Sequence, residues 1–338
     1  MSTGTLSALR PVRLNPAVTL AGGLGLVVLA SLALGSNLIA PDQVLRALLD
    51  PSADADGVVW GSRVPRTVIG LIVGFCLGVA GGVMQGQTGN PLADPGLFGV
   101  SAGASLAVVM GAYLMGHSSM TASLLLALGG ALAASLIVFG IGTLSRDLTN
   151  PVPLAIAGTA VTALLGGVIS FLVLTNTGAL EAYRVWVVGS LSGRSLDGLI
   201  PAVLAALAGL VLALLNARAL NSLTLGVDLA QGLGETLWQA RVVGLAAITL
   251  TTASAVALSG PIGFIGLTAP HLGRALVGGN HYRLLPVAGL IGAITLLTCD
   301  VLGRLIGGQA EVPVGVVLLV LGGVAFVAIV RRTKLAAL

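Results

Sequence analysis

Apolar and polar positions alternate along this chain in long blocks. Runs of mainly apolar residues recur through its whole length, separated by short stretches that carry charges, prolines or glycines. A helix of about 20 apolar residues spans the hydrocarbon core of a bilayer, which is roughly 30 Å thick. The pattern therefore predicts ten membrane-spanning helices, near residues 17–36, 64–86, 97–115, 121–142, 153–174, 199–216, 241–259, 261–278, 284–306 and 313–330.

The composition places the chain in the membrane class. Hydrophobic residues make up 56% and charged residues 8% of the 338 positions, whereas a soluble domain has roughly a quarter of its residues charged. We expect one all-α polytopic domain over residues 1–338, with lipid around it and no nucleic-acid partner, because the basic residues form no stripe. Cys76 and Cys299 lie inside apolar blocks, so we expect core residues and no metal site.

The charged residues predict an orientation. An even number of spans puts both termini on one side, and the cytoplasmic side of membrane proteins carries an excess of Lys and Arg. With both termini in the cytoplasm, most of the basic residues fall inside. Arg63, Arg66 and Arg304 then lie outside. They could be anchors at the lipid interface or a cationic patch that receives an acidic partner.

Landmarks of the second span recur late in the chain at nearly the same spacing. The two sets are Arg63, Gly82 and Pro91 in the first copy and Arg241, Gly260 and Pro270 in the second. Five spans separate the copies, so they face opposite ways across the membrane. We predict half-repeats over about 63–175 and 241–330, and inverted repeats are typical of transporters.

Two motifs raise the question of enzyme chemistry. "GVSAG" at 99–103 fits the G-x-S-x-G pattern of serine hydrolases, but it lacks an obvious base, so Ser101 is better explained as a small helix-contact residue. No G-x-x-x-x-G-K-[ST] motif surrounds the single lysine, Lys334. The chain is therefore not expected to be an enzyme, and an ATP-driven motor would have to be another polypeptide.

Two further features stand out. Asp300 lies deep in the ninth span with Arg304 four residues later, which predicts an ion pair on one helix face.

The longest cytoplasmic connection, about 217–240, reads "ARALNSLTLGVDLAQGLGETLWQA". It could be a plain connector or a docking helix pair around Gly226 and Gly234.

Several segments together resemble the FecCD-like permeases, the iron-siderophore and vitamin B12 branch of ABC importers. They span nearly the whole chain in the order of that family. The matching segments are "RVPRT" (63–67), "GVAGGVMQGQTGNPLADPGLFGVSAGAS" (78–105), "LAIAGTAV" (154–161), "LTLGVDLAQGLG" (223–234), "SGPIGFIGLTAPHLGRALVGGNHYRLLP" (259–286) and "EVPVGVVLLVLGG" (311–323).

The resemblance implies a type II ABC importer permease fold in the bacterial cytoplasmic (inner) membrane. It also implies a second permease subunit, identical or a close paralogue, and a substrate-binding protein on the outer side. Two cytoplasmic ATPase subunits would use ATP and Mg²⁺, while this chain would bind no cofactor itself.

The resemblance further implies roles for particular residues. Arg63, Arg66 and Arg304 would face acidic residues of the binding protein. The ATPase contact would fall on Asp228, Ala230, Gly234 and Glu235. The cytoplasmic gate loop would be Thr149, Asn150, Pro151 and Val152, which differ from the small hydroxyl pair of some relatives.

The prolines and polar residues of "GNPLADPG" predict a structural turn between the second and third spans. Asn90, Pro91, Asp94 and Pro95 would form this turn on the cytoplasmic side, and Pro270 would be the matching break in the second copy.

We expect the chain to move a ferric siderophore complex by ATP-driven alternating access, with vitamin B12 or haem as alternative cargo. A secondary transporter that works without a motor is a different class, which the inverted repeat alone supports.

Overall fold

Helices form nearly all of the described part of the chain. The computed structural model describes residues 16–35, 38–54, 57–116, 119–143 and 152–332, which contain thirteen α-helices and no strand. The α-helices are α1 (Pro16–Ala33), α2 (Pro41–Leu49), α3 (Val64–Thr88), α4 (Val100–Met115), α5 (Met120–Thr143), α6 (Val152–Thr175), α7 (Thr177–Val187), α8 (Ile200–Leu223), α9 (Val227–Gly232), α10 (Leu237–Ser259), α11 (Ile265–Val277), α12 (His281–Gly307) and α13 (Val314–Arg332).

Each of the ten predicted spans coincides with one helix. Seven of these helices in the described residues are long and apolar enough to cross a membrane, while α4, α11 and the apolar part of α13 are shorter. The remaining helices, α2, α7 and α9, connect spans. The prediction that a connection begins near residue 217 was wrong, because α8 continues to Leu223 and buries Ala217, Ala219 and Leu220.

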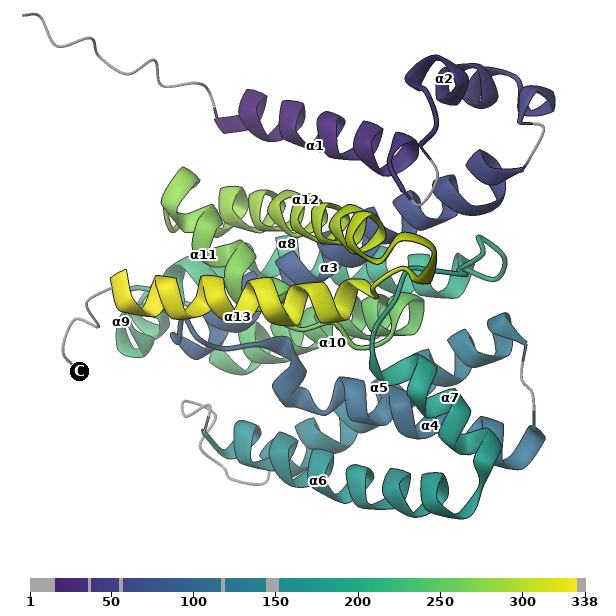
Figure 1. Ribbon diagram of the computed structural model, residues 1–338. Helices are drawn as coiled ribbons and strands as arrows, with labels where there is room; N and C mark the ends of the chain where they lie inside the picture. The colour runs from purple at the N-terminus through teal and green to yellow at the C-terminus, as the bar shows by residue number, and fades with distance from the viewer. Residues whose placement is uncertain (1–15, 36–37, 55–56, 117–118, 144–151, 333–338) are drawn as a thin grey trace, which may run out of the picture.

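The long helices run side by side, and the short α9 lies at one end of the bundle (Figure 1). We call this the α9 end and the opposite one, which carries Arg66, the Arg66 end. Neighbouring helices α3 and α10 are antiparallel, since Gln87 near the C-terminus of α3 donates to the carbonyl of Ala240 near the N-terminus of α10, at 2.7 Å. The N-terminal end of α1 and the C-terminal part of α13 also lie at the α9 end (Figure 1).

Helix α3 occupies the centre and packs against α8, α10, α11 and α12. Its contacts depend on glycine: a Cβ at Gly74 would meet the backbone of Ala293, one at Gly78 the backbone of Ala288, and one at Gly81 the backbone of Gly266. Backbones approach this closely only where the side chain is absent.

The contacts among helices α3 to α6 resemble the contacts among helices α10 to α13. Helix α3 packs on α12 as α10 packs on α5, and α4 packs on α5 as α11 packs on α12. In these contacts α3 corresponds to α10, α4 to α11 and α5 to α12, which is their order along the two predicted half-repeats. Each half-repeat begins with one of the antiparallel helices, α3 or α10.

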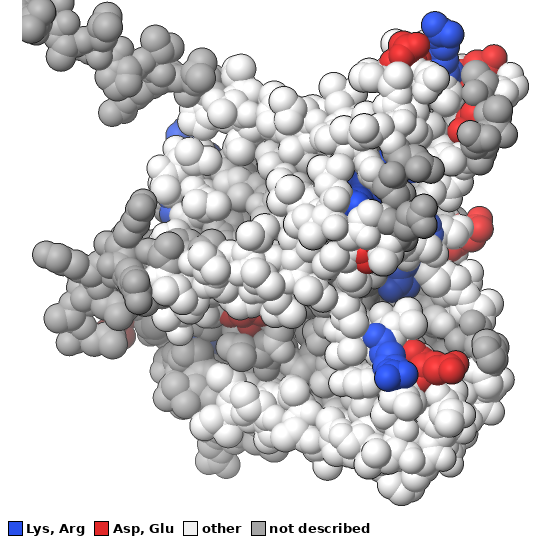
Figure 2. Space-filling model, viewed as in Figure 1, with Lys and Arg blue, Asp and Glu red and all other residues white. Residues whose placement is uncertain are grey.

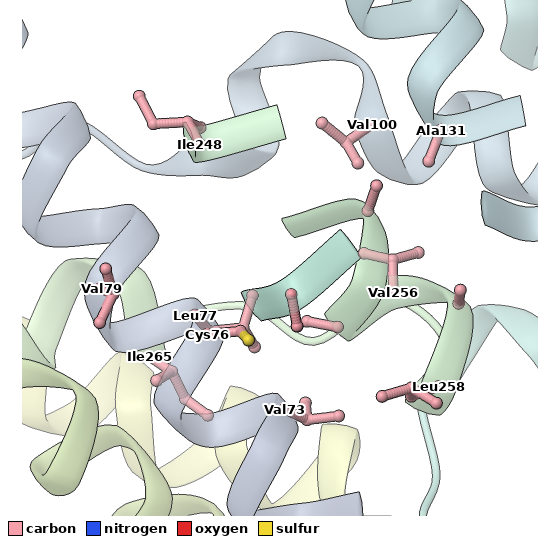
Figure 3. Close-up of a cluster of buried hydrophobic side chains, with 14 of the residues drawn as sticks. Val73, Cys76, Leu77, Val79, Val100, Ala131, Ile248, Val256, Leu258 and Ile265 are labelled. Carbon is pink, nitrogen blue, oxygen red and sulfur yellow. The ribbon is translucent and has the colours of Figure 1, made fainter. Parts of the chain in front are cut away.

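The interior is a continuous apolar cluster in which side chains of α3 meet those of α10 and α11. Figure 3 shows Val73 and Leu77 of α3 with Val256 of α10 and Ile265 of α11 among them. Cys76 and Cys299 are both buried free thiols.

Gly78→Ala should lower the free energy of unfolding by about 1–3 kcal/mol, because the added methyl group forces α3 away from the backbone of Ala288. Thermal unfolding in detergent measures the change. Gly129→Ala in α5 is the matched control, since nothing lies within 4 Å of its Cβ position. An equal loss of stability in both variants would contradict the close-packing account.

Candidate functional site

A buried carboxylate lies between two arginines at the Arg66 end. Asp300 of α12 is fully buried. It accepts hydrogen bonds from Arg66 of α3, with Nε 2.9 Å from Oδ2 and Nη2 2.9 Å from Oδ1. Arg304, one helical turn further along α12, forms an ion pair with the same carboxylate, since its Nη2 lies 3.2 Å from Oδ2. Bidentate pairing of an arginine with a carboxylate is stronger than pairing through a single hydrogen bond.

A second carboxylate extends the cluster toward the surface. Arg66 Nη1 lies 2.7 Å from Glu311 Oε2, which also accepts a bond from the Ser192 hydroxyl at 3.0 Å. Glu311 has a φ of 37°, a conformation that a residue with a side chain adopts only when its surroundings hold it. Arg304 donates to the carbonyl of Ser31 at 3.0 Å, and Arg63 donates to that of Leu34.

The predicted cationic patch is therefore not open to the surface. Arg63 and Arg66 are each 5% exposed and Arg304 is 1% exposed. Burial at this depth is tolerated because each guanidinium has a carboxylate or carbonyl partner. The predicted Asp300–Arg304 pair is present. The partnership of Asp300 with Arg66 was missed, since the two residues are far apart in the sequence and no local spacing signals their contact.

The stretch from Asn90 to Pro95 turns the chain from α3 toward α4. Gly89 ends α3 with a φ of 61°, a left-handed conformation that suits glycine. Asn90 Oδ1 accepts the amide of Leu92 at 2.9 Å, and Asp94 Oδ1 accepts that of Gly96 at 2.8 Å. Asn90 and Pro91 are exposed, as expected of a turn.

The second half of this stretch differs from the surface turn that we expected. Pro95 is buried and packs at the Cβ position of Gly266 in α11. Asp94 and Ser101 line a cavity of about 480 Å³ with Thr252 and Gly263. Among the described residues that line this cavity there is no histidine, so the structure places no histidine base beside Ser101 there.

Pro270 lies buried inside α11 without ending it. Proline has no N–H, so the carbonyl four residues earlier, that of Gly266, loses its helical partner. Gln85 of α3 donates to the carbonyls of Leu267 and Gly266, at 3.2 and 3.4 Å. The Oε1 atom of Gln85 accepts a bond from Arg274 at 2.6 Å. Gln85 thus supplies the hydrogen-bond donor that Pro270 lacks, and it links α11 to α3.

The predicted ATPase-contact segment forms one short helix rather than a helix pair. Helix α9 lies between Gly226 and Gly234, whose φ angles are 104° and 85°. Ala230 is buried and Asp228 is exposed. Glu235 Oε1 lies 3.3 Å from Arg218 Nε and 3.2 Å from the Ser222 hydroxyl, so it ties the segment back to α8.

The exposed side chains of this segment are largely apolar. Leu225, Leu229 and Leu233 are each about three-fifths exposed, at 59%, 62% and 59%. They are spaced four residues apart. Of the predicted gate residues, Thr149, Asn150 and Pro151 lie outside the described residues, and Val152 begins α6.

Ten apolar helices, with a buried ion pair between α3 and α12, define a polytopic membrane protein. A family model, the FecCD transport family, matches residues 23–332. The chain belongs to this family, and it is a permease of the metal-chelate type of ABC importer.

Characterised relatives are similar over almost their full length. The chain is 42% identical over 325 residues to the ferric enterobactin transport system permease protein FepD of Escherichia coli, covering 95% of this chain and 97% of that one. It is 40% identical over 331 residues to the hemin transport system permease protein HmuU of Yersinia pestis, covering 95% and 98%.

A solved structure has the same fold. It is an inward-facing conformation of a transporter assigned to the metal-chelate type of ABC transporters, with a TM-score of 0.78 and 25% sequence identity. The match covers 94% of this chain and 98% of that one.

Asp300→Asn should lower the free energy of unfolding by about 3–5 kcal/mol, because it leaves Arg66 and Arg304 buried without their shared charge. Chemical unfolding of the protein in detergent measures the loss. Asp42→Asn, which removes an ion pair between exposed Asp42 and Arg46, should leave stability nearly unchanged. If Asp300→Asn were as harmless as this control, the cluster would not stabilise the bundle.

Proposed function

We propose that this chain is the permease subunit of a binding-protein-dependent ABC importer that moves a ferric siderophore complex into the cytoplasm by ATP-driven alternating access. The relatives named for ferric enterobactin and hemin support a metal chelate as cargo. Hemin or vitamin B12 is the alternative cargo. A motor-independent secondary transporter, the other class that the inverted repeat suggested, does not agree with membership of the FecCD transport family.

The apolar row on the α9 segment is the observation that carries the ATPase partnership. Leu225, Leu229 and Leu233 project from a short segment at the α9 end, which Glu235 holds against α8. Large apolar side chains beyond the ends of spans favour burial by another protein. We propose that each of two ATPase subunits, which use ATP and Mg²⁺, binds this segment on one permease of a dimer.

The Arg66 end is the proposed site of binding-protein docking. Arg63, Arg66 and Arg304 are buried, and Glu311 already occupies Nη1 of Arg66. An acidic residue of a partner could therefore reach Arg66 only after Glu311 moves. With this end outside, α9 and both chain termini face the cytoplasm of a bacterial inner membrane, in agreement with the distribution of basic residues.

Leu229→Glu should abolish co-purification of the permease with its ATPase subunits, because a charge replaces an apolar contact at the centre of the row. Pull-down of the detergent-solubilised complex, followed by quantification of both subunits, measures the effect.

The matched control is Leu49→Glu. Leu49 ends α2 and is 78% exposed, and α2 lies away from the α9 end (Figure 1). This variant should retain the ATPase subunits. Full retention of these subunits by Leu229→Glu would overturn the proposed contact.

A further inference from the structure

A large cavity lies at the Arg66 end, between α4, α7 and the loop that follows α7. Its volume is about 860 Å³. It shares Ser190, Ser192 and Pro313 with a smaller cavity that contains Arg66 and Glu311. Most charged side chains in view gather at this end of the molecule (Figure 2). A volume in this range suits a small-molecule ligand.

Arg194 contributes a cation to the wall of this cavity. Its Nε donates to the carbonyl of Ser190 at 3.4 Å, and its guanidinium carbon lies 5.5 Å from the ring centroid of Trp186. No Asp or Glu forms an ion pair with Arg194 in the part of the chain that the structure describes. Burial lowers the pKa of Arg194 to about 10, so the side chain stays cationic at neutral pH. A cation with no acidic partner is ready to bind an anion.

Trp186 gives an independent indication of a ligand. Trp186 is one of the residues that line the cavity and is 4% exposed, and its buried indole Nε1 has no hydrogen-bond partner among the described residues. A buried donor without a partner is uncommon and costs free energy of folding. Its neighbour in the wall, Arg194, is also a donor, so both groups favour a ligand rich in acceptor oxygens.

The other charged residues that line the cavity do not neutralise the positive charge of Arg194. Glu181 and Arg184 lie three residues apart on α7, are both exposed, and have opposite signs. Two arginines and one glutamate leave the lining with a net positive charge. Tyr113 and Trp186 add aromatic surface, against which planar ligand groups can stack.

We propose that this cavity is a binding subsite for an anionic, oxygen-rich metal chelate, held by Arg194 and by the indole N–H of Trp186 before it enters the pathway. The proposal rests on the proposed function and narrows its substrate class. An iron(III) tris-catecholate is a trianion and fits the subsite, whereas an iron(III) tris-hydroxamate is uncharged and gains nothing from Arg194.

The test measures equilibrium binding of two radiolabelled gallium(III) chelates, a tris-catecholate and a tris-hydroxamate, to the full chain in liposomes. Arg194→Ala should raise the Kd of the tris-catecholate at least tenfold and change that of the tris-hydroxamate less than twofold. Arg194→Lys should restore part of the affinity. Trp186→Phe, which keeps the ring and removes the N–H, should weaken binding of the tris-catecholate severalfold.

Arg46→Ala is the matched control, because Arg46 is an exposed arginine of α2 outside the cavity lining. It should leave both affinities unchanged. Equal effects of Arg194→Ala on the two chelates, or no effect on either, would overturn the subsite.

Uptake by the complete transporter separates this inference from the proposed function. If uptake is driven by ATP and Arg194→Ala does not alter the preference for the anionic chelate, the subsite alone is wrong. If the chain binds the tris-catecholate through Arg194 but ATP drives no uptake by the assembled complex, the importer proposal alone is wrong.

Discussion

The structure depends on one helix, α3, that is enclosed by protein. A helix in this position can bury its whole surface only if its neighbours approach closely, and Gly74, Gly78 and Gly81 permit this against α11 and α12. Lipid offers no polar partners, so every polar group that α3 carries must be satisfied by those same neighbours. Arg66 at one end and Gln85 near the other meet this requirement through Asp300 and the α11 backbone.

The two ends of the molecule differ in the side chains that they bury and expose. At the Arg66 end, two arginines and two carboxylates link α3, α12 and the loop that carries Glu311. At the α9 end, Glu235 holds a short segment that leaves a row of leucines exposed. The first end is held together mainly by buried charges, whereas the second leaves an apolar surface exposed. Such a difference suits the proposed function, in which the two ends bind different proteins.

The sequence predicted the spans well because hydrophobic length is a local property, and each of the ten runs became one helix. It predicted the Asp300–Arg304 pair for the same reason. It could not reveal that Asp300 pairs with Arg66, or that Pro95 packs on Gly266, because both contacts join distant segments. The exposure of Arg63 and Arg66 was misjudged because charge and position near a span end do not indicate what covers a side chain.

Uptake into liposomes tests the central claim most directly. The permease, reconstituted with its ATPase subunits and a binding protein loaded with a radiolabelled ferric chelate, should accumulate the label inside only when ATP and the binding protein are both present. Accumulation by the permease alone, driven by an ion gradient without ATP, would contradict the account and identify a secondary transporter.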